Sequence, residues 1–322
     1  NRMFEFVGIN TENEEGTTIS KVPISIEMEN LSFRFPGRKR ILENISLTVY
    51  QNEIIFIIGE SGCGKSTLCK IIEKSYKPEA GSIVLDGNLN LSNISLGSWR
   101  NVIGVIPQDV FIFSGTVLDN ISLGAQSGDI ESVLNSCSQW GIDKYIQQLP
   151  QGYMTVVGEE GINLSGGQKQ LIALARLLIK DPAVMILDEP TAGLDPKERI
   201  RIRNLISDLS EDRIVLIATH VVSDIEFISK EILLMKNGRL VDQDSPENLQ
   251  KRIYGHVYEL CISQDELAEV KKEYEISNLF RRDGEIIVRV IADKCPVKYD
   301  AVKVSPTLED VYLYEFEGVK RR

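Results

Sequence analysis

The stretch Gly59-Glu60-Ser61-Gly62-Cys63-Gly64-Lys65-Ser66-Thr67 has the spacing of a phosphate-binding loop, G-x-x-x-x-G-K-[ST]. It follows a continuously apolar run, Ile54–Ile58, which indicates a buried strand, and a helix is expected from about Ser66. Glycines let backbone N–H groups turn towards phosphates, and Lys65 supplies a cation for them. The Ser66 hydroxyl is suited to ligate Mg²⁺. The stretch therefore predicts a nucleotide site between a buried strand and a helix.

A pair of carboxylates ends a second apolar run further along the chain. Val184–Leu187 is followed directly by Asp188 and Glu189. After a phosphate-binding loop, Asp188 is expected to hold Mg²⁺, and Glu189 to orient and polarise the water that attacks the terminal phosphate. Two acids at a strand end are often only surface charge. The loop upstream favours the catalytic interpretation.

A second glycine-rich turn, Leu164-Ser165-Gly166-Gly167-Gln168, lies between these two motifs. Ser165 and Gln168 have the spacing of a capping box, which predicts a helix that opens at this turn and runs to about Lys180. A capped helix start with two glycines is a second cradle for phosphate. Leu-Ser-Gly-Gly-Gln is also the signature motif of the ATP-binding cassette (ABC) family, which this chain resembles.

The resemblance implies a fold, an activity and cofactors. The expected fold is α/β, a P-loop NTPase of ABC type with an antiparallel β subdomain, a helical subdomain at about 109–180 and a small C-terminal α+β appendage. The expected activity is hydrolysis of ATP to ADP and phosphate, coupled to transport, with ATP and Mg²⁺ as cofactors.

Four further residues match positions that have roles in that family. Phe35 falls where an aromatic ring stacks on adenine, although a core position is the alternative. Gln108 resembles the glutamine that touches Mg²⁺ and senses the transmembrane partner. Asp195, in Ala192-Gly193-Leu194-Asp195, matches the loop that crosses to the other subunit. His220 matches the histidine that contacts the γ-phosphate. The resemblance thus implies that Glu189, His220 and Gln108 are catalytic.

The ABC resemblance also implies a paired working form. Lys65, Asp188, Glu189 and His220 would form half of each active site, and Ser165–Gln168 would belong to the neighbour's half. We therefore expect a two-fold ATP sandwich, as a homodimer or with a related ABC ATPase, and contact with transmembrane domains near Gln108.

The domain organisation expected from the sequence has three parts. Residues 1–20 have the composition of a linker; the start at Asn1 and the apolar stub Met3–Val7 lead us to expect a missing membrane domain before it. Residues 21–250 would form the nucleotide-binding domain. Residues 251–322 would form the appendage, with strands at Val257–Ile262, Ile286–Ile291 and Tyr299–Val304 and helices at 264–274 and 307–315.

Composition narrows the possible partners and location. Among 322 residues, 36 are basic and 47 acidic, a formal charge of −11, which opposes non-specific binding to nucleic acid. Five scattered cysteines suggest a reducing compartment. No apolar run approaches the roughly 20 residues that span a bilayer. We expect a cytoplasmic chain that lies at the inner face of the cell membrane when bound to its membrane partner.

The subfamily resemblances differ along the chain. Up to about Gln168 it resembles exporters with fused membrane domains, such as peptide or bacteriocin exporters, on Phe113–Ile121 and Val157–Gly161. From about Ala192 it resembles stand-alone ATPase subunits of two-gene efflux systems. This contrast suggests a mosaic joined near Leu187–Leu194, either an engineered chimera or a natural recombinant.

Three classes of function follow from these observations. The leading one is the ATP-hydrolysing module of a membrane exporter, with a peptide, bacteriocin or drug as substrate. A non-transport ABC ATPase acting on nucleic acid or ribosomes is opposed by the acidic balance. A module that holds ATP without hydrolysing it is opposed by Glu189 and His220.

Overall fold

The computed structural model describes residues 15–19, 22–125, 129–159, 161–222, 228–282 and 284–317. Most of the expected linker, residues 1–20, and the stub Met3–Val7 lie outside the described residues.

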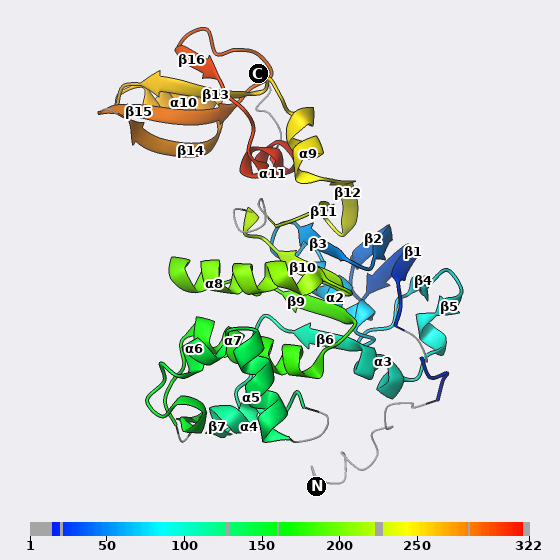
Figure 1. Ribbon diagram of the computed structural model, residues 1–322. Coiled ribbons are helices and arrows are strands. Elements are labelled where there is room, and N and C mark those ends of the chain that lie inside the picture. The colour runs from blue at the N-terminus through cyan, green and yellow to red at the C-terminus, as the bar shows by residue number, and fades with distance from the viewer. Residues whose placement is uncertain are drawn as a thin grey trace.

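A six-stranded sheet forms the centre of the molecule, in the order β12-β11-β3-β10-β9-β6 (Figure 1). Five of the strands are parallel, and the edge strand β12 runs antiparallel to β11. The sheet consists of β3 (Glu53–Ile58), β6 (Ile103–Ile106), β9 (Val184–Asp188), β10 (Ile214–Thr219), β11 (Glu231–Lys236) and β12 (Arg239–Asp244). The parallel strands are apolar except at their ends, because helices or a second sheet cover both of their faces.

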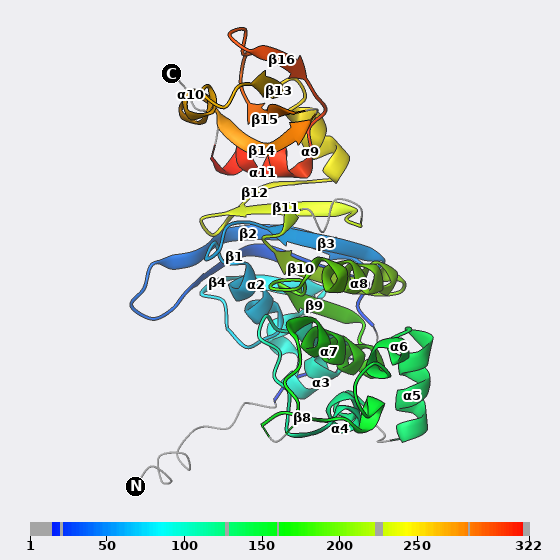
Figure 2. The ribbon, with the colours of Figure 1, turned by 90° about the vertical axis from the view of Figure 1, so that its left-hand side faces the viewer.

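One face of this sheet is covered by helices. Phe56, Leu187 and Ile217 belong to a core cluster that also includes side chains of α7 (Gly166–Lys180) and α8 (Pro196–Ser207). The end of the molecule beyond α7 holds a short pair of strands and further helices (Figure 2). These elements are β7 (Gly115–Thr116), α4 (Val117–Ser122), α5 (Ile130–Gln139), α6 (Asp143–Ile146), η2 (Gly152–Met154) and β8 (Val156–Val157).

The opposite face packs against a helix and an antiparallel sheet. Ile55, Ile57 and Leu216 share a core cluster with α2 (Lys65–Ile72) and with strands of the second sheet, which has the order β2-β1-β4-β5. Its strands are β1 (Ser25–Arg34), β2 (Arg40–Tyr50), β4 (Ala80–Leu85) and β5 (Leu89–Asn90), followed by η1 (Leu91–Asn93) and α3 (Leu96–Val102). Trp99 of α3 is fully buried, and its Nε1 donates to the Ile72 carbonyl at 2.8 Å.

A third sheet of four antiparallel strands, in the order β14-β15-β13-β16, lies at the C-terminal end (Figure 1). It contains β13 (Val257–Ile262), β14 (Glu275–Arg282), β15 (Glu285–Ile291) and β16 (Asp300–Lys303). The helices beside it are α9 (Pro246–Arg252), α10 (Leu267–Glu273) and α11 (Leu308–Phe316), and the 3-10 helix η3 (Asp208–Ser210) follows α8.

Helices α9 and α11 join this third sheet to the nucleotide-binding part. Leu249 of α9 and Val311 of α11 belong to the same core cluster as Leu234 of the central sheet. The Lys236 side chain donates from Nζ to the Phe316 carbonyl at 2.7 Å, at the C-terminal end of α11. The expected boundary at residues 250–251 falls inside α9.

In the part of the chain that the structure describes, no helix has both the length and the apolar character needed to cross a bilayer.

Candidate nucleotide site

The phosphate-binding loop connects β3 to α2 in a conformation that depends on glycine. Gly62 and Gly64 have φ angles of 82° and 112°, which L side chains rarely adopt. A Cβ on Gly59 would lie 2.2 Å from the Met235 carbonyl oxygen and 2.6 Å from the Cys63 sulfur. The loop therefore runs against β11, and burial raises the pKa of the Cys63 thiol.

Lys65 is the first residue of α2 and is 5% exposed. Its Nζ donates to the Gly59 carbonyl at 2.7 Å and to the Glu60 carbonyl at 3.2 Å, so the ammonium bends back over its own loop. The N-cap Gly64 has no side chain to cap α2, and no acidic residue lies in the first turn of this fully described helix. Backbone N–H groups and an ammonium thus converge at one place, which is the chemistry that binds phosphate.

Ser66 and Asp188 are in direct contact although 122 residues separate them. The Ser66 hydroxyl donates to Asp188 Oδ1 at 3.0 Å, and Asp188 is the last residue of β9. Burial raises the pKa of Asp188, and the hydrogen bond from Ser66 offsets only part of this effect. A carboxylate held in its charged form at such a place needs a nearby cation.

Glu189 begins the turn after β9 in a left-handed conformation, with a φ of 51°. Its N–H donates to the Ala218 carbonyl at 2.8 Å, which fixes the backbone against β10. The side chain is buried, and Glu189 Oε1 lies 3.7 Å from Lys65 Nζ. A non-glycine residue in this conformation is held there by its surroundings, a form of strain that is common at active sites.

Three donors from the end of β10 surround the Glu189 carboxylate. The Thr219 hydroxyl and the His220 N–H both donate to Oε2 at 3.2 Å, and His220 Nδ1 lies 2.9 Å from Oε1. The His220 side chain is 53% exposed, so one side of its ring faces solvent. Together with α11 residues Glu309 and Tyr312, His220 lines a cleft of about 410 Å³.

Gln108 lies two residues after β6, on an exposed segment. The last residue of β6, Ile106, pairs with Leu187, which directly precedes Asp188. The sheet therefore brings Gln108 to the same edge as Ser66, Asp188 and Glu189.

Phe35 belongs to an aromatic cluster next to β1. Its ring meets the rings of Phe33 and Tyr76 edge-on, with centroids 5.1 and 5.4 Å apart, and Phe33 and Tyr76 are stacked on each other. Phe35 is half-buried. It therefore packs partly against the core, which was the alternative considered from the sequence, and part of its ring stays accessible.

The signature turn forms a separate group with the start of α8. The expected capping box is present: Ser165 Oγ accepts from the Gln168 N–H at 3.1 Å, and Gln168 Oε1 accepts from the Ser165 N–H at 2.8 Å. Asp195 is the N-cap of α8. A Cβ on Gly166 would lie 3.4 Å from the Leu194 side chain, and Ser165 Oγ donates to Glu198 Oε1 at 2.7 Å.

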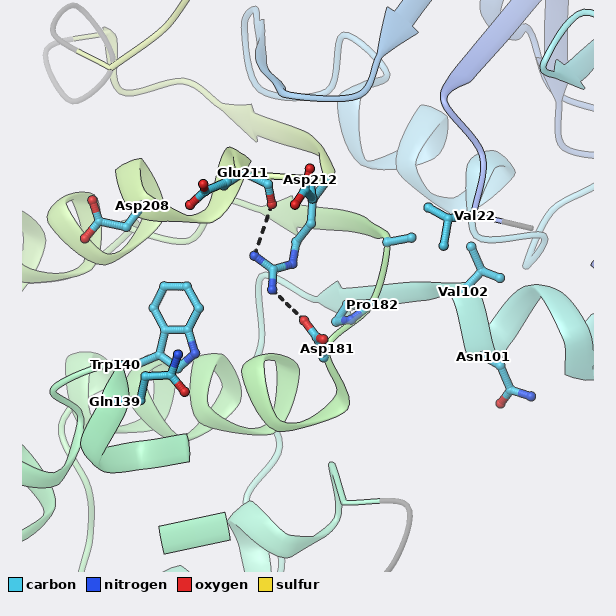
Figure 3. Close-up of a pocket in the computed structure, with 12 residues that line it drawn as sticks. Val22, Asn101, Val102, Gln139, Trp140, Asp181, Pro182, Asp208, Glu211 and Asp212 are labelled. Carbon is cyan, nitrogen blue, oxygen red and sulfur yellow. Dashed lines mark hydrogen bonds and ion pairs between the residues drawn. The ribbon is translucent and has the colours of Figure 1, made fainter. Parts of the chain in front are cut away.

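A second hollow, of about 540 Å³, opens where the parallel strands of the central sheet begin, at the opposite end of these strands from the phosphate-binding loop (Figure 3). Arg213 lines it, 2.5 Å from Asp181, and its guanidinium lies over the Trp140 ring, 5.8 Å from the ring centroid. Asn101, Ala183 and Arg213 line it and come before β6, β9 and β10, whereas the catalytic candidates come after these strands. Ligands of such sheets bind at the carboxyl ends of the strands, so this hollow is not the nucleotide site.

The donor set fits Mg²⁺ bound together with a nucleotide. Ser66 and Asp188 offer two hard oxygens 3.0 Å apart, and Gln108 offers an amide oxygen from the same sheet edge. Within the described residues, no group of three or more His, Cys, Asp or Glu side chains could hold a metal ion. Mg²⁺ in nucleotide sites takes one or two protein ligands and completes its shell with phosphate oxygens and water.

The structure thus gathers most of the predicted residues into two groups. Around Lys65 lie Ser66, Asp188, Glu189 and His220; around Ser165 lie Gln168 and Asp195. The sequence analysis missed Thr219, Tyr76 and Glu198, which touch the predicted residues. Of these, Thr219 had a signal, because it directly precedes His220 at a strand end.

Comparisons with known proteins agree with this geometry. Residues 42–192 match the family described as ABC transporter. The chain is 37% identical over 238 residues to a putative multidrug export ATP-binding/permease protein of Staphylococcus aureus, a match that covers 73% of this chain and 41% of that protein. It is 35% identical over 261 residues to multidrug resistance protein 1 of Entamoeba histolytica, covering 80% of this chain and 20% of the relative.

A solved structure, a bacterial Atm1-family ABC exporter with ATP bound, resembles the chain with a TM-score of 0.70 and 31% sequence identity. The likeness covers 78% of this chain and 44% of that one. The chain therefore spans less than half the length of these three similar proteins.

Proposed function

Residues 42–192 belong to the ABC transporter family, and from that premise we propose that the chain powers export across a membrane by closing into an ATP sandwich with a second ABC domain. The observation that carries the proposal is the set of contacts joining Lys65, Ser66, Asp188, Glu189 and His220 at one edge of the central sheet. The similarity to exporters supports the direction of transport.

In this proposal the phosphate-binding loop holds the nucleotide. Lys65 binds the β- and γ-phosphates, and the uncapped start of α2 adds backbone N–H groups. Ser66 and Asp188 would hold Mg²⁺, with Gln108 beside them, and the ion would neutralise charge on the phosphates. The Phe35 ring would stack on adenine, supported from behind by Phe33 and Tyr76.

Glu189 is the proposed general base. The donors Thr219 and His220 fix the direction of its carboxylate, so its rotamer is set before a substrate arrives. In the reaction Glu189 accepts a proton from the attacking water as the oxygen bonds to the γ-phosphorus and the bond to ADP breaks. His220 and Lys65 would stabilise the charge that develops on the phosphoryl oxygens.

The second half of each site would come from a partner. Ser165–Gln168 form a capped helix start whose local contacts run to Leu194 and Glu198 rather than to the phosphate-binding loop. A head-to-tail pair, with a second copy or a related ABC domain, would place this turn on the partner's γ-phosphate. Asp195 lies beside the turn and would accompany it across the interface.

The proposed contact with transmembrane domains lies just after Gln108. Phe111 and Phe113 are 67% and 52% exposed, and their rings meet at 4.8 Å. Arg176 holds this segment by donating to the Phe111 carbonyl at 2.8 Å. Large exposed aromatic side chains in a supported segment suit a protein interface. The names of the relatives favour a drug-like substrate, and a peptide or bacteriocin is the alternative.

The substitution Glu189→Gln tests the proposal because it keeps the side chain's shape and removes the base. We expect turnover of MgATP to fall by roughly 10²-fold or more. ATP should still bind, and the slow variant should accumulate as an ATP-bound dimer. Phosphate release and sedimentation velocity, with and without MgATP, measure the two effects.

Glu211→Gln is the matched control, since Glu211 is an exposed acid at the opposite edge of the sheet. It should hydrolyse ATP at the parent rate. Unchanged turnover in Glu189→Gln would refute the assignment of the base, and a variant that stays monomeric at saturating MgATP would refute a sandwich between two copies of this chain.

A further inference from the structure

A carboxylate of the same chain, that of Glu198, already occupies the signature turn. The Ser165 hydroxyl donates to Glu198 Oε1 at 2.7 Å. The carboxylate also lies tightly against Gly167, because a Cβ built there would come within 2.2 Å of the Glu198 carboxyl carbon. Glu198 therefore sits on the two-glycine turn at the start of α7, where the helix presents its free N–H groups.

The Glu198 side chain does not make the contact that is usual for a residue at the third position of a helix. It is the third residue of α8, and its N–H donates to the N-cap Asp195 at 2.8 Å. In α4, α7 and α11, which the structure describes completely, the residue at this position folds its side chain back to its own N-cap. Glu198 instead extends to the neighbouring helix, whose first turn contains no acid among its described residues.

A phosphate arriving at the same turn would compete with this carboxylate. The Ser165 hydroxyl has one proton, and its oxygen already accepts from the Gln168 N–H. The proton can be donated to Glu198 or to a phosphate oxygen, but not to both. Two anions at one helix start would also repel each other, so the carboxylate has to leave before the phosphate can take its place.

We propose that Glu198 occupies the phosphate position of the signature turn and sets the ATP concentration at which the sandwich closes. This inference rests on the proposed function, because the competing phosphate belongs to ATP held by the partner. Glu198 is thus a positioning residue: it acts on the reaction through Ser165 and touches no reacting atom. Glu198 lies on α8, three residues after Asp195. A displacement of Glu198 would therefore be coupled to movement of the Asp195 loop, which would cross the interface.

The first test compares dimer closure in two variants that hydrolyse ATP slowly, Glu189→Gln and Glu189→Gln with Glu198→Gln. Glutamine keeps the length of the side chain and removes its charge, and a neutral acceptor holds a hydroxyl less strongly than a carboxylate does. We expect the double variant to form half of its dimer at an ATP concentration about tenfold lower. Sedimentation velocity across an ATP titration measures this midpoint.

Glu131→Gln in the same background is the matched control. Glu131 lies in the first turn of α5 and is exposed, so it reports the effect of removing a first-turn charge elsewhere. Its midpoint should equal that of the Glu189→Gln parent. A midpoint for the Glu198→Gln variant that is unchanged or higher than the parent's would overturn the inference, because Glu198 would then not oppose closure.

A second test needs no dimer and separates this inference from the proposed function. In Lys65→Ala the phosphate-binding loop loses its cation, which leaves the signature turn as the main anion site. Adding Glu198→Ala should free that turn, so inorganic phosphate should raise the melting temperature of Lys65→Ala/Glu198→Ala more than that of Lys65→Ala. Equal shifts would overturn the inference even if the sandwich forms. A larger rise in melting temperature for Lys65→Ala/Glu198→Ala than for Lys65→Ala would support it even if no dimer is found.

Discussion

At the scale of single residues, the need for glycine at position 59 of the phosphate-binding loop can be tested by substituting it and a glycine elsewhere in the chain. Gly59→Ala would force its methyl group against the Met235 carbonyl, which is backbone and cannot turn aside. We expect the free energy of unfolding to fall by about 1–3 kcal/mol, the usual cost of overpacking, and nucleotide affinity to fall with it because the loop must shift. Urea unfolding and binding of a fluorescent ATP analogue measure the two effects.

Gly97→Ala is the control for this substitution. Gly97 lies inside α3, and no atom comes within 4 Å of a Cβ built there. Alanine should therefore stabilise the protein by about 0.5–1 kcal/mol, because it favours the helix more than glycine does. Similar losses of stability in both variants would contradict the steric explanation.

The residues that could be predicted from the sequence are those at fixed spacings within short motifs. Lys65 and Ser66 follow from the phosphate-loop spacing, and the capping box of Ser165 from a pattern of four residues. Glu198 could not be found in this way, because its contact with Ser165 joins segments 33 residues apart and depends on how α7 and α8 pack. Tyr76 was missed for a similar reason, since its aromatic partners are Phe33 on β1 and Phe35 just after this strand.

At the scale of elements, a buried ion pair ties α11 to β15. Arg289 Nη2 donates to Asp310 Oδ2 at 2.7 Å, and Asp310 is completely buried. Burial by itself raises the pKa of Asp310, but hydrogen bonds from Arg289, Ser277 and Thr307 outweigh it and hold the pKa below its usual value of 3.8. The charged form is therefore the one that stabilises the fold.

Asp310→Asn should lower the free energy of unfolding by about 2 kcal/mol at pH 7, because Arg289 loses its nearest carboxylate and keeps only Glu259, whose Oε1 lies 3.5 Å from Arg289 Nη1. The native pKa is depressed, so the carboxylate's contribution is present above the unfolded value and is lost as the pH falls through the folded pKa. The difference between the two proteins should persist from pH 7 to 5 and shrink below about pH 4. Urea unfolding at several pH values measures it.

Asp265→Asn, an exposed acid in the same part of the chain, is the control and should change little at any of these pH values. If the Asp310→Asn difference grew as the pH fell, the assignment of the stabilising form would be wrong.

Elements with strong periodicity or clear turns were predicted well, and elements without them were not. The hairpin at Lys236–Arg239 follows from Asn237 and Gly238, which both have positive φ angles. In the third sheet, β13 and β15 were predicted because most of their residues are apolar. The strand β14 was not, because it lies at an edge of the sheet and is mostly polar and exposed, so no buried face marks its sequence.

At the scale of the whole molecule, the shared core predicts that the third sheet and the nucleotide-binding part unfold together. Val311 of α11 is 2% exposed and lies in the cluster that also contains residues of β3, β9 and β10. Val311→Ala should cost about 2 kcal/mol and shift a single unfolding transition of the whole described chain. Circular dichroism and the fluorescence of a nucleotide bound to the site should report the same midpoint.

Val297→Ala is the control because Val297 is 91% exposed and the chemical change is the same. It should leave the midpoint unchanged. Two separate transitions in Val311→Ala, one for each part, would contradict a shared core.

The proposed mosaic also belongs to this scale. Its two resemblances meet near Leu187–Leu194, close to the candidate carboxylates Asp188 and Glu189 and to the start of α8, which contacts the signature turn. Separate comparison of the residues before and after Asp188 with known ABC proteins would test it, and the same subfamily as the best match of both parts would remove the hypothesis. If the mosaic is correct, the contact of Glu198 with Ser165 joins residues of different ancestry.

The position of α11 in the chain also affects how the protein is made. Leu308, Val311 and Phe316 belong to the same core cluster as Ile54, Phe56 and Ile58 of β3 and are synthesised some 250 residues after that strand. A ribosome adds about 5–20 residues per second, so this core cluster lacks its α11 residues for roughly 10 to 50 seconds during translation. The nascent chain therefore passes through a long interval in which its core cluster is incomplete, and apolar side chains that are exposed in this interval favour aggregation.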